Sequence, residues 1–547
     1  MANQRTITKL PVLPNNVIKY LIEIFVDSYY SDNYLNHSSF KMIDNVFFRF
    51  GMVCQQWMDR VLPSLEFKKP IYCYRAFTYI MLSRWVMLGV KFSNVVFGGG
   101  QIHDLEVQLL TMTKPYLRNS ISTLLVDRES HFNSLRFQFE DIKALIFREP
   151  KSITQFAHFV SPLLSEEFPP IDTLTRVDVH YEVKIVHSDT DDVIQPLNLL
   201  CGKFINISDI NIRGFNQNQK ISRNICKYPN VIQKLKTLNL KFDFINVKDI
   251  TVALTHPFSC IEILKLHRTK TKGDAVMNEP LYHALETHPT ITSLSLQLPD
   301  ESIPSHTLTN LLNNTKLKSL KLKYKTIDFD KSYNSTFLTN NTITKLGLEI
   351  KNITFKLIDS ICDKLPNLKS LKLAVYGEVD GKDIELFKPK SNITIKLTIV
   401  NSFKNMDAYL SKYSLHTRVN HLTLIIDNNN EKLLNNLLDN FKLLEKLKTL
   451  KTLFLDTPFT AALIPPLSSN TNIKHLIIRM PELKNMTRND NSDKNLLELI
   501  KGNRSLESIE LTNPGKIINF AYLNTEFKKH PHLKFIFSKD LSESLQK

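Results

Sequence analysis

A short phrase recurs from the middle of this chain to its C-terminus, and it constrains the possible fold more than any other feature. In each copy, an asparagine- or proline-rich turn leads into a strand-like Leu-x-Leu. The clearest copies carry their leucines at Leu238/Leu240, Leu264/Leu266, Leu294/Leu296, Leu320/Leu322, Leu346/Leu348, Leu371/Leu373, Leu422/Leu424 and Leu453/Leu455. The intervals 238 to 264, 320 to 346 and 346 to 371 measure 26, 26 and 25 residues. A fixed period of this length predicts stacked structural repeats rather than separate globular domains.

The spacing of the aliphatic residues predicts how each repeat contributes to a core. Alternate side chains of a strand share one face, so both leucines point inward and the residue between them points outward. A third aliphatic residue precedes the first leucine by three positions in many copies, as at Ile261, Ile291, Leu317, Ile343, Leu368 and Ile473. One unit cannot bury these side chains alone, whereas stacked units bury each of them at a gain of about 1.5–3 kcal/mol.

Much of the sequence between two such strands has the pattern of a helix. Residues 355–365 place four aliphatic side chains at helical spacing and are followed by Pro366. Residues 280–288 begin with a proline, which suits the first turn of a helix, and residues 431–447 form a further amphipathic run. We therefore predict one strand and one helix in a typical repeat.

A strand and a helix within such a period resemble the leucine-rich repeat of the ribonuclease-inhibitor-like intracellular class. The regular asparagine that extracellular leucine-rich repeats carry after Leu-x-Leu is absent, which favours the intracellular class. The resemblance implies an α/β solenoid, with parallel strands on its concave face and helices on its convex face, preceded by a small all-α domain. We expect a helical F-box-like domain at 1–70, a transition of helices and degenerate repeats at 71–165, and the leucine-rich-repeat solenoid at 166–547.

Weaker copies of the strand pattern extend the predicted array toward both ends. The candidate strands are residues 95–97, 124–126, 145–147, 177–179 and 210–212 on the N-terminal side, and 476–478, 509–511 and 535–537 on the C-terminal side. Near residue 395, three aliphatic residues alternate (Ile395, Leu397 and Ile399), so the sequence leaves the register of that strand open. Atypical terminal repeats are expected where a stacked array must end its core.

Several features that the sequence lacks narrow the class of protein. The first residues have no apolar segment of the signal-peptide type, and no run of about 18 apolar residues could span a membrane. The six cysteines are scattered without a Cys-x-x-Cys pair, which favours buried, reduced thiols over disulfides or a zinc site. We expect a protein of the cytoplasm or the nucleus, without a membrane partner.

Motifs that would indicate an enzyme are absent from the sequence as well. The glycines at 98–100 lack the spacing of a dinucleotide-binding turn, and neither a phosphate-binding Gly-x-x-x-x-Gly-Lys-Ser/Thr loop nor His-Glu-x-x-His occurs. His283 and His288 are five residues apart and do not share a helix face as a metal-binding pair would. We interpret them as an exposed helix residue and a helix-end residue. We expect no catalytic residue, no cofactor and no metal.

The charge of the chain suggests a type of partner. It has 70 lysines and arginines against 54 acidic residues, a formal net charge of +16, spread along the chain as on an ordinary solvated surface. In the predicted strands, the residues beside the inward leucines point outward. On stacked strands they would form a basic stripe along the strand face. The predicted partner-binding residues are Lys241, Lys265, His267, Lys321, Lys323, Lys325, Lys345 and Lys372. Such a stripe favours an acidic or phosphorylated protein partner. Nucleic acid is disfavoured, because few aromatic residues lie among the basic ones.

Residues 10–62 do not repeat and carry two apolar helix patterns. The first begins at Leu13-Pro14 and continues through Ile18 and Ile22, and the second ends in Val-Cys-Gln-Gln-Trp at 53–57. This pairing resembles the F-box, a small helical module. The two halves lie about a dozen residues farther apart than is usual for that module, and Gln55 replaces its usual basic residue. Two helices that cap the first repeat are the simpler alternative.

An F-box followed by leucine-rich repeats resembles the substrate receptors of cullin-type ubiquitin ligases. The resemblance implies that Leu13, Pro14, Ile18 and Ile22 contact a Skp-type adaptor and, through it, a cullin scaffold, while the solenoid holds the substrate. Such a receptor has no catalytic residue of its own. The alternative function is a leucine-rich-repeat interaction scaffold without a ligase role, and the fold alone does not decide between the two.

Overall fold

The computed structural model of the protein describes much of the region from residue 60 to residue 538. The described residues are 60–67, 71–73, 81–82, 84–85, 87–92, 95–97, 123–126, 142–148, 153–166, 170–181, 194–215, 225–242, 247–268, 279–328, 338–351, 353, 355–376, 394–400, 419–425, 451–456, 463–479, 492–512 and 533–538. The chain divides into two compact units, Met1–Ile261 and Glu262–Lys547. The predicted boundaries at residues 70 and 165 stay a prediction.

The first unit contains a parallel sheet whose strands pair in chain order. The strands are β2 (Ile71–Cys73), β4 (Val95–Phe97), β5 (Thr123–Val126), β6 (Ala144–Arg148), β7 (Arg176–Tyr181), β8 (Asp209–Phe215) and β9 (Leu235–Phe242). Helices α6 (Ile153–Leu164), α7 (Gln195–Lys203), α9 (Pro229–Ile232) and α10 (Val247–Thr255) belong to the same unit. A second parallel pair joins β1 (Glu66–Phe67) to β3 (Lys91–Phe92) after a short 3-10 helix, η2 (Leu62–Ser64). The five N-terminal candidate strands all lie in strands of this sheet.

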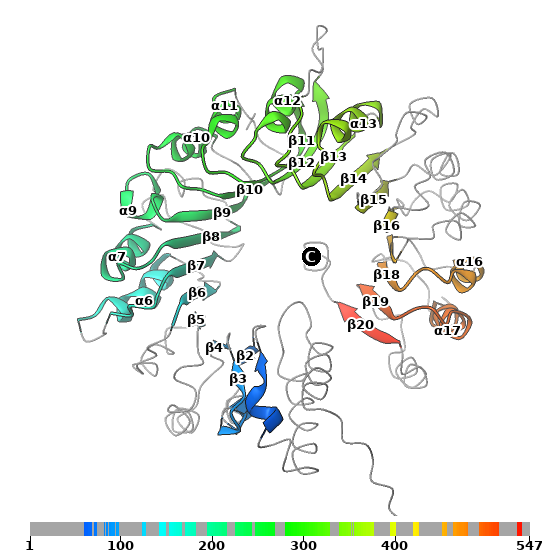
Figure 1. The fold of residues 1–547 in the computed structure, drawn as a ribbon, viewed down its shortest axis with the longest axis horizontal. Coiled ribbons are helices and arrows are strands. Elements are labelled where there is room, and N and C mark those ends of the chain that lie inside the picture. The colour runs from blue at the N-terminus through cyan, green and yellow to red at the C-terminus, as the bar shows by residue number, and fades with distance from the viewer. Residues whose placement is uncertain are drawn as a thin grey trace, which may run out of the picture. The chain divides into compact units, whose positions relative to one another are not determined.

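The second unit repeats the same arrangement in a longer parallel series. Its strands, each paired with the next, are β10 (Ile263–Arg268), β11 (Ser293–Pro304), β12 (Ser319–Asp328), β13 (Lys345–Ile350), β14 (Ser370–Tyr376), β15 (Thr394–Val400), β16 (Val419–Ile425), β17 (Thr452–Asp456), β18 (His475–Arg479), β19 (Ser508–Thr512) and β20 (Lys534–Ser538). Among its described residues, the helices are α11 (Glu279–Thr287), α12 (Ser305–Asn313), α13 (Phe355–Lys364), α16 (Ile464–Ser469) and α17 (Ser492–Gly502). In Figure 1, α11, α12 and α13 lie along the same side of strands β10 to β14.

The strand register stacks the leucines of neighbouring repeats directly on one another. The first leucines form the series Leu264, Leu294, Leu320, Leu346 and Leu371, and each is at most 2% exposed. The second leucines continue in the same register. The open register near residue 395 is resolved, because Leu371 pairs with Ile395 and Leu373 with Leu397. The prediction of an α/β fold with parallel strands is confirmed, and the stacked leucines form its core.

The predicted helices are confirmed where the structure describes them. Residues 355–365 contain α13 and residues 280–288 contain most of α11, whereas the run at 431–447 lies outside the described residues. In α13, Ile358 and Ile361 are buried, each 1% exposed. The amphipathic pattern thus packs the helix onto the leucine core and leaves its polar side toward solvent.

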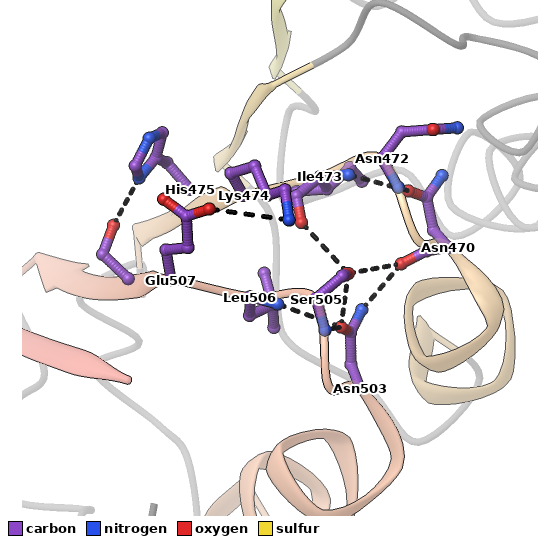
Figure 2. A network of polar contacts seen from close by, with 10 residues as sticks. Asn470, Asn472, Ile473, Lys474, His475, Asn503, Ser505, Leu506 and Glu507 are labelled. Carbon is purple, nitrogen blue, oxygen red and sulfur yellow. Dashed lines mark hydrogen bonds and ion pairs between the residues drawn. The ribbon is translucent and has the colours of Figure 1, made fainter. Parts of the chain in front are cut away.

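Asparagines in the turns before the strands tie consecutive repeats together. Figure 2 shows Asn503, which follows α17 and precedes β19. Its Nδ2 donates to the carbonyl oxygens of Leu467 (2.6 Å) and Asn470 (2.9 Å) in the preceding repeat. Its Oδ1 accepts from the backbone N–H of Ser505 at 2.8 Å. One buried amide therefore fixes the turn and satisfies two carbonyls that the previous helix end leaves open.

The same arrangement recurs in other turns, at the same position in the sequence relative to the following strand. Asn340 donates to the carbonyls of Leu312 (2.8 Å) and Asn314 (3.0 Å) and accepts from the N–H of Thr342 (2.8 Å). Each of these asparagines lies three positions before the aliphatic residue that precedes the strand: Asn340 before Ile343, and Asn503 before Leu506. His288 occupies this position in the turn before β11, where its Nδ1 lies 3.4 Å from the backbone N of Thr290.

Candidate functional site

The side chains between the inward leucines form rows across the second unit's strands, on the face opposite the leucines. The register places Lys265, Ser295, Lys321, Gly347, Lys372 and Lys396 in one row. His267, Gln297, Lys323, Glu349 and Ala374 form the next row. Lysines that are far apart in the sequence thus come to lie on nearby strands, as the sequence predicts.

One carboxylate lies at the centre of this basic face. Glu349 of β13 is 7% exposed, and the strands on either side each supply a lysine to it. Lys372 Nζ of β14 lies 2.8 Å from Glu349 Oε1, and Lys323 Nζ of β12 lies 3.4 Å from Oε2. We call Glu349 and the lysines Lys321, Lys323 and Lys372 the Glu349 cluster.

A glycine allows the third lysine to approach. A Cβ atom added at Gly347, in the strand between Lys321 and Lys372, would stand 3.2 Å from Lys321 Cγ. The Lys321 side chain therefore packs against the backbone of β13 at Gly347. Any larger residue at position 347 would press against it. Lys321 thus adds a third positive charge near the carboxylate that Lys323 and Lys372 contact, and the cluster carries two more positive than negative charges.

The pKa values reflect the crowding of these charges. Burial raises the pKa of the Glu349 carboxyl, but the charges of Lys372, Lys323 and Lys321 and the hydrogen bond from Lys372 outweigh burial and hold it below its usual value. Burial lowers the pKa of the Lys321 ammonium; Glu349 opposes this, and the neighbouring lysines, including Lys265, add to it. An additional anion would relieve the repulsion among the lysines.

The remaining residues of the predicted stripe occupy different environments. Lys325 and Lys345 are exposed, whereas Lys265 and His267 are half-buried on the same strand face. Lys241 lies in β9 of the first unit, and its side chain lies outside the described residues. The stripe therefore has a well-defined centre at the Glu349 cluster, to which Lys321, Lys323 and Lys372 contribute directly.

The first unit has its own buried carboxylate on the outward face of its strands. Asp178 of β7 is 2% exposed and accepts two hydrogen bonds from Arg176, from Nε at 2.8 Å and from a terminal nitrogen at 2.7 Å. Asn211 Nδ2 of β8 also donates to it, at 2.6 Å. The hydrogen bond to Asp178 raises the pKa of Arg176, against the opposing effect of burial. This group is a balanced ion pair, so it offers less attraction to an anion than the Glu349 cluster.

Sequence reasoning missed Glu349, Gly347 and the Asp178 group. The available signal was the alternation in Lys-Leu-Gly-Leu-Glu-Ile at 345–350, where a glycine and a glutamate occupy the outward positions that lysines hold in β12. The predicted adaptor contacts Leu13, Pro14, Ile18 and Ile22 lie outside the described residues, so their role stays a prediction.

A shallow polar hollow of about 410 Å³ lies beside the ends of α11 and α12. Glu286, Asn310 and Asn314 line it, and they bond to one another: Asn310 Nδ2 donates to Glu286 Oε2, and Asn314 Nδ2 to the Glu286 carbonyl, both at 3.0 Å. The first contact joins α12 to α11, and the second joins the turn after α12 to α11. In the part of the chain that the structure describes, no three His, Cys, Asp or Glu side chains gather as metal ligands would. No helix there is long and apolar enough to cross a membrane.

Comparisons with known proteins add no relative. Models of known protein families give no match to the chain, and a search of curated proteins gives none. The functional argument therefore depends on the geometry of the strand face and on the sequence patterns.

Proposed function

We propose that this protein is a leucine-rich-repeat solenoid without catalytic activity, which binds an acidic or phosphorylated protein segment on its strand face. The observation that carries the proposal is the Glu349 cluster, where Lys323 and Lys372 contact a single buried carboxylate and Lys321 adds a third positive charge. A surplus of positive charge on a partly desolvated surface attracts anionic groups more strongly than scattered lysines do.

The architecture supports a binding role. The parallel strands place outward side chains at fixed positions on one face, and the helices α11 to α13 lie along one side of those strands (Figure 1). In a solenoid this arrangement makes the strand face concave and rigid. A rigid surface loses little conformational entropy on binding, which favours affinity for an extended segment.

The first experiment neutralises the cluster without leaving a buried charge unpaired. The variant combines Lys321→Gln, Lys323→Gln, Lys372→Gln and Glu349→Gln, and so removes two net positive charges. Reversal of Lys321 and Lys323 to glutamate would be a poorer test, because it would place new carboxylates beside buried Glu349. Immobilised protein is incubated with a mixture of acidic, serine-phosphorylated and basic peptides. We expect the intact protein to retain acidic or phosphorylated peptides. The variant should retain at least tenfold less of these peptides.

The matched control removes the same net charge from the turn before β12. Lys316→Gln with Lys318→Gln changes two exposed lysines and should leave peptide capture unchanged. Equal capture by the four-residue variant and the intact protein would contradict binding at this face. Circular dichroism on each variant verifies that the strands and helices are retained.

We further propose that the bound segment belongs to a substrate of a cullin-type ubiquitin ligase, for which this chain would be the receptor. The support is the F-box-like pattern at Leu13-Pro14, Ile18, Ile22 and 53–57, followed by leucine-rich repeats. The chain would then act in the cytoplasm or the nucleus and would hold the substrate while partner proteins transfer ubiquitin.

The adaptor contact can be tested in the full chain. Leu13→Ala with Pro14→Ala should abolish co-purification with a Skp-type adaptor, because both residues belong to the predicted contact. Leu10→Ala with Pro11→Ala is the matched control, since it alters a neighbouring Leu-Pro pair. If the unaltered chain captures no adaptor, the alternative function, an interaction scaffold without a ligase role, stands in its place.

A further inference from the structure

We propose that Glu349 sets a charge threshold for the ligand of the strand face, so that the protein retains a phosphorylated residue and not a single carboxylate side chain. This inference rests on the proposed function and specifies its ligand. It assigns Glu349 the role of a specificity-determining residue, which lowers the affinity of the lysines for every anion.

Glu349 is a counter-charge that is built into the face. It is buried in β13 and is bound from both sides, by Lys372 Nζ at 2.8 Å and by Lys323 Nζ at 3.4 Å. An ammonium group has three N–H donors, so each lysine retains donors for a ligand while it contacts Glu349. A ligand therefore adds to the cluster without displacing the glutamate, and it experiences the repulsion of Glu349 for as long as it is bound.

A phosphate would lie on the solvent side of Lys323 and Lys372, the two lysines that contact Glu349. Their side chains are 37% and 38% exposed, and they belong to β12 and β14, the strands on the two sides of β13. Strands two places apart in a sheet are about 9.6 Å apart, a distance that two lysine side chains can span with a phosphate between them. A phosphate has three acceptor oxygens and a charge of about −1.5 to −2, which is close to the surplus of two positive charges.

A carboxylate ligand fits these charges less well. A single Asp or Glu side chain brings one negative charge, so the cluster keeps a positive surplus while the ligand still faces Glu349. The attraction to the lysines is about half that of a phosphate dianion, and it must offset the same loss of hydration and side-chain freedom of the lysines. Glu349 thus brings a single carboxylate side chain below the affinity needed for capture and leaves a phosphorylated residue above it.

The test compares two variants of the full chain. Glu349→Gln removes the charge and keeps an acceptor for the lysines, whereas Glu507→Gln is the matched control. Glu507 is an exposed partner of Lys474, at 3.5 Å, and belongs to the same unit. The probes are fluorescein-labelled peptides that differ at one position, which is phosphoserine, glutamate or serine, together with inorganic phosphate as a competitor and an oligouridylate.

We expect the intact protein to bind the phosphoserine peptide and to bind the glutamate and serine peptides too weakly to measure. Glu349→Gln should tighten binding of the phosphoserine peptide by about tenfold and bring the glutamate peptide into the measurable range. Glu507→Gln should change neither. Inorganic phosphate should compete with the peptide, because both offer the same acceptor oxygens to the lysines.

Several results would overturn the inference. Weaker phosphopeptide binding by Glu349→Gln would mean that the glutamate positions the lysines instead of opposing the ligand. Equal binding of the glutamate and phosphoserine peptides by the intact protein would contradict the charge threshold. It would not contradict the proposed function, which requires only that the face binds an anionic segment. Tighter binding of oligouridylate than of the phosphopeptide would identify a nucleic-acid face. The proposed function itself fails separately, if the four-residue neutral variant captures peptides as well as the intact protein does.

A second variant tests the contribution of Lys321 independently of Glu349. Gly347→Ala places a Cβ at 3.2 Å from Lys321 Cγ and moves that side chain. We expect it to weaken phosphoserine-peptide binding several-fold while the glutamate peptide stays unmeasurable. Unchanged phosphopeptide binding would show that the position of the Lys321 side chain does not matter to the ligand, which contradicts its place in the Glu349 cluster.

Discussion

Leu320→Ala should lower the free energy of unfolding by about 2–5 kcal/mol. Leu320 is 1% exposed, and the register places it between Leu294 of β11 and Leu346 of β13. Truncation removes contacts to both neighbouring repeats and leaves a cavity that parallel strands on either side cannot easily close. Urea denaturation followed by circular dichroism measures the loss as a lower midpoint.

The chain provides a matched control for this substitution. Leu338 is 65% exposed and lies in the same unit, before β13. Leu338→Ala makes the same chemical change at the surface, so we expect it to alter the free energy of unfolding by less than about 0.5 kcal/mol. If the two substitutions cost the same, the stacked leucines do not form the core described above.

The stacking of the leucines can be predicted because burial requires aliphatic residues at regularly spaced positions in the sequence. Each strand has one buried face, so its inward positions must be aliphatic, and their spacing fixes the register. The spacing alone is therefore enough to pair Leu320 with Leu346. The turns are less predictable: their asparagines are evident, but the donation from Asn340 to the carbonyls of Leu312 and Asn314 depends on how two repeats pack.

The strand face can be predicted in part, for a related physical reason. Outward positions are free to vary, so their chemistry does not follow the period and reveals no partner by itself. Lys323, Glu349 and Lys372 belong to three strands, and their convergence becomes evident once the register aligns positions that are about 25 residues apart. The sequence indicates the lysines as a basic stripe, whereas the burial of the acid at its centre depends on the packing of the three strands.

We expect His288 to make the stability of the protein depend on pH. Its side chain is 3% exposed, and burial lowers its pKa to about 4. In the unfolded chain a histidine titrates near its ordinary pKa of about 6.5. Below that value the unfolded state binds a proton that the folded state does not bind, so stability is fully present above pH 6.5 and declines as the pH falls toward 4. The total loss from this residue is on the order of 3 kcal/mol.

His288→Asn should abolish this part of the acid sensitivity. Asparagine holds the equivalent position at Asn314, Asn340, Asn470 and Asn503, where its Oδ1 accepts the backbone N–H two residues on, as the His288 ring does from Thr290. The variant should therefore fold, and its urea midpoint should fall less than that of the unaltered protein between pH 6.5 and pH 4. His283→Asn, at an exposed position of α11, is the control and should keep the original pH dependence. If His288→Asn shows the same decline as the control, the buried ring does not titrate in this range, and the acid sensitivity must come from other groups.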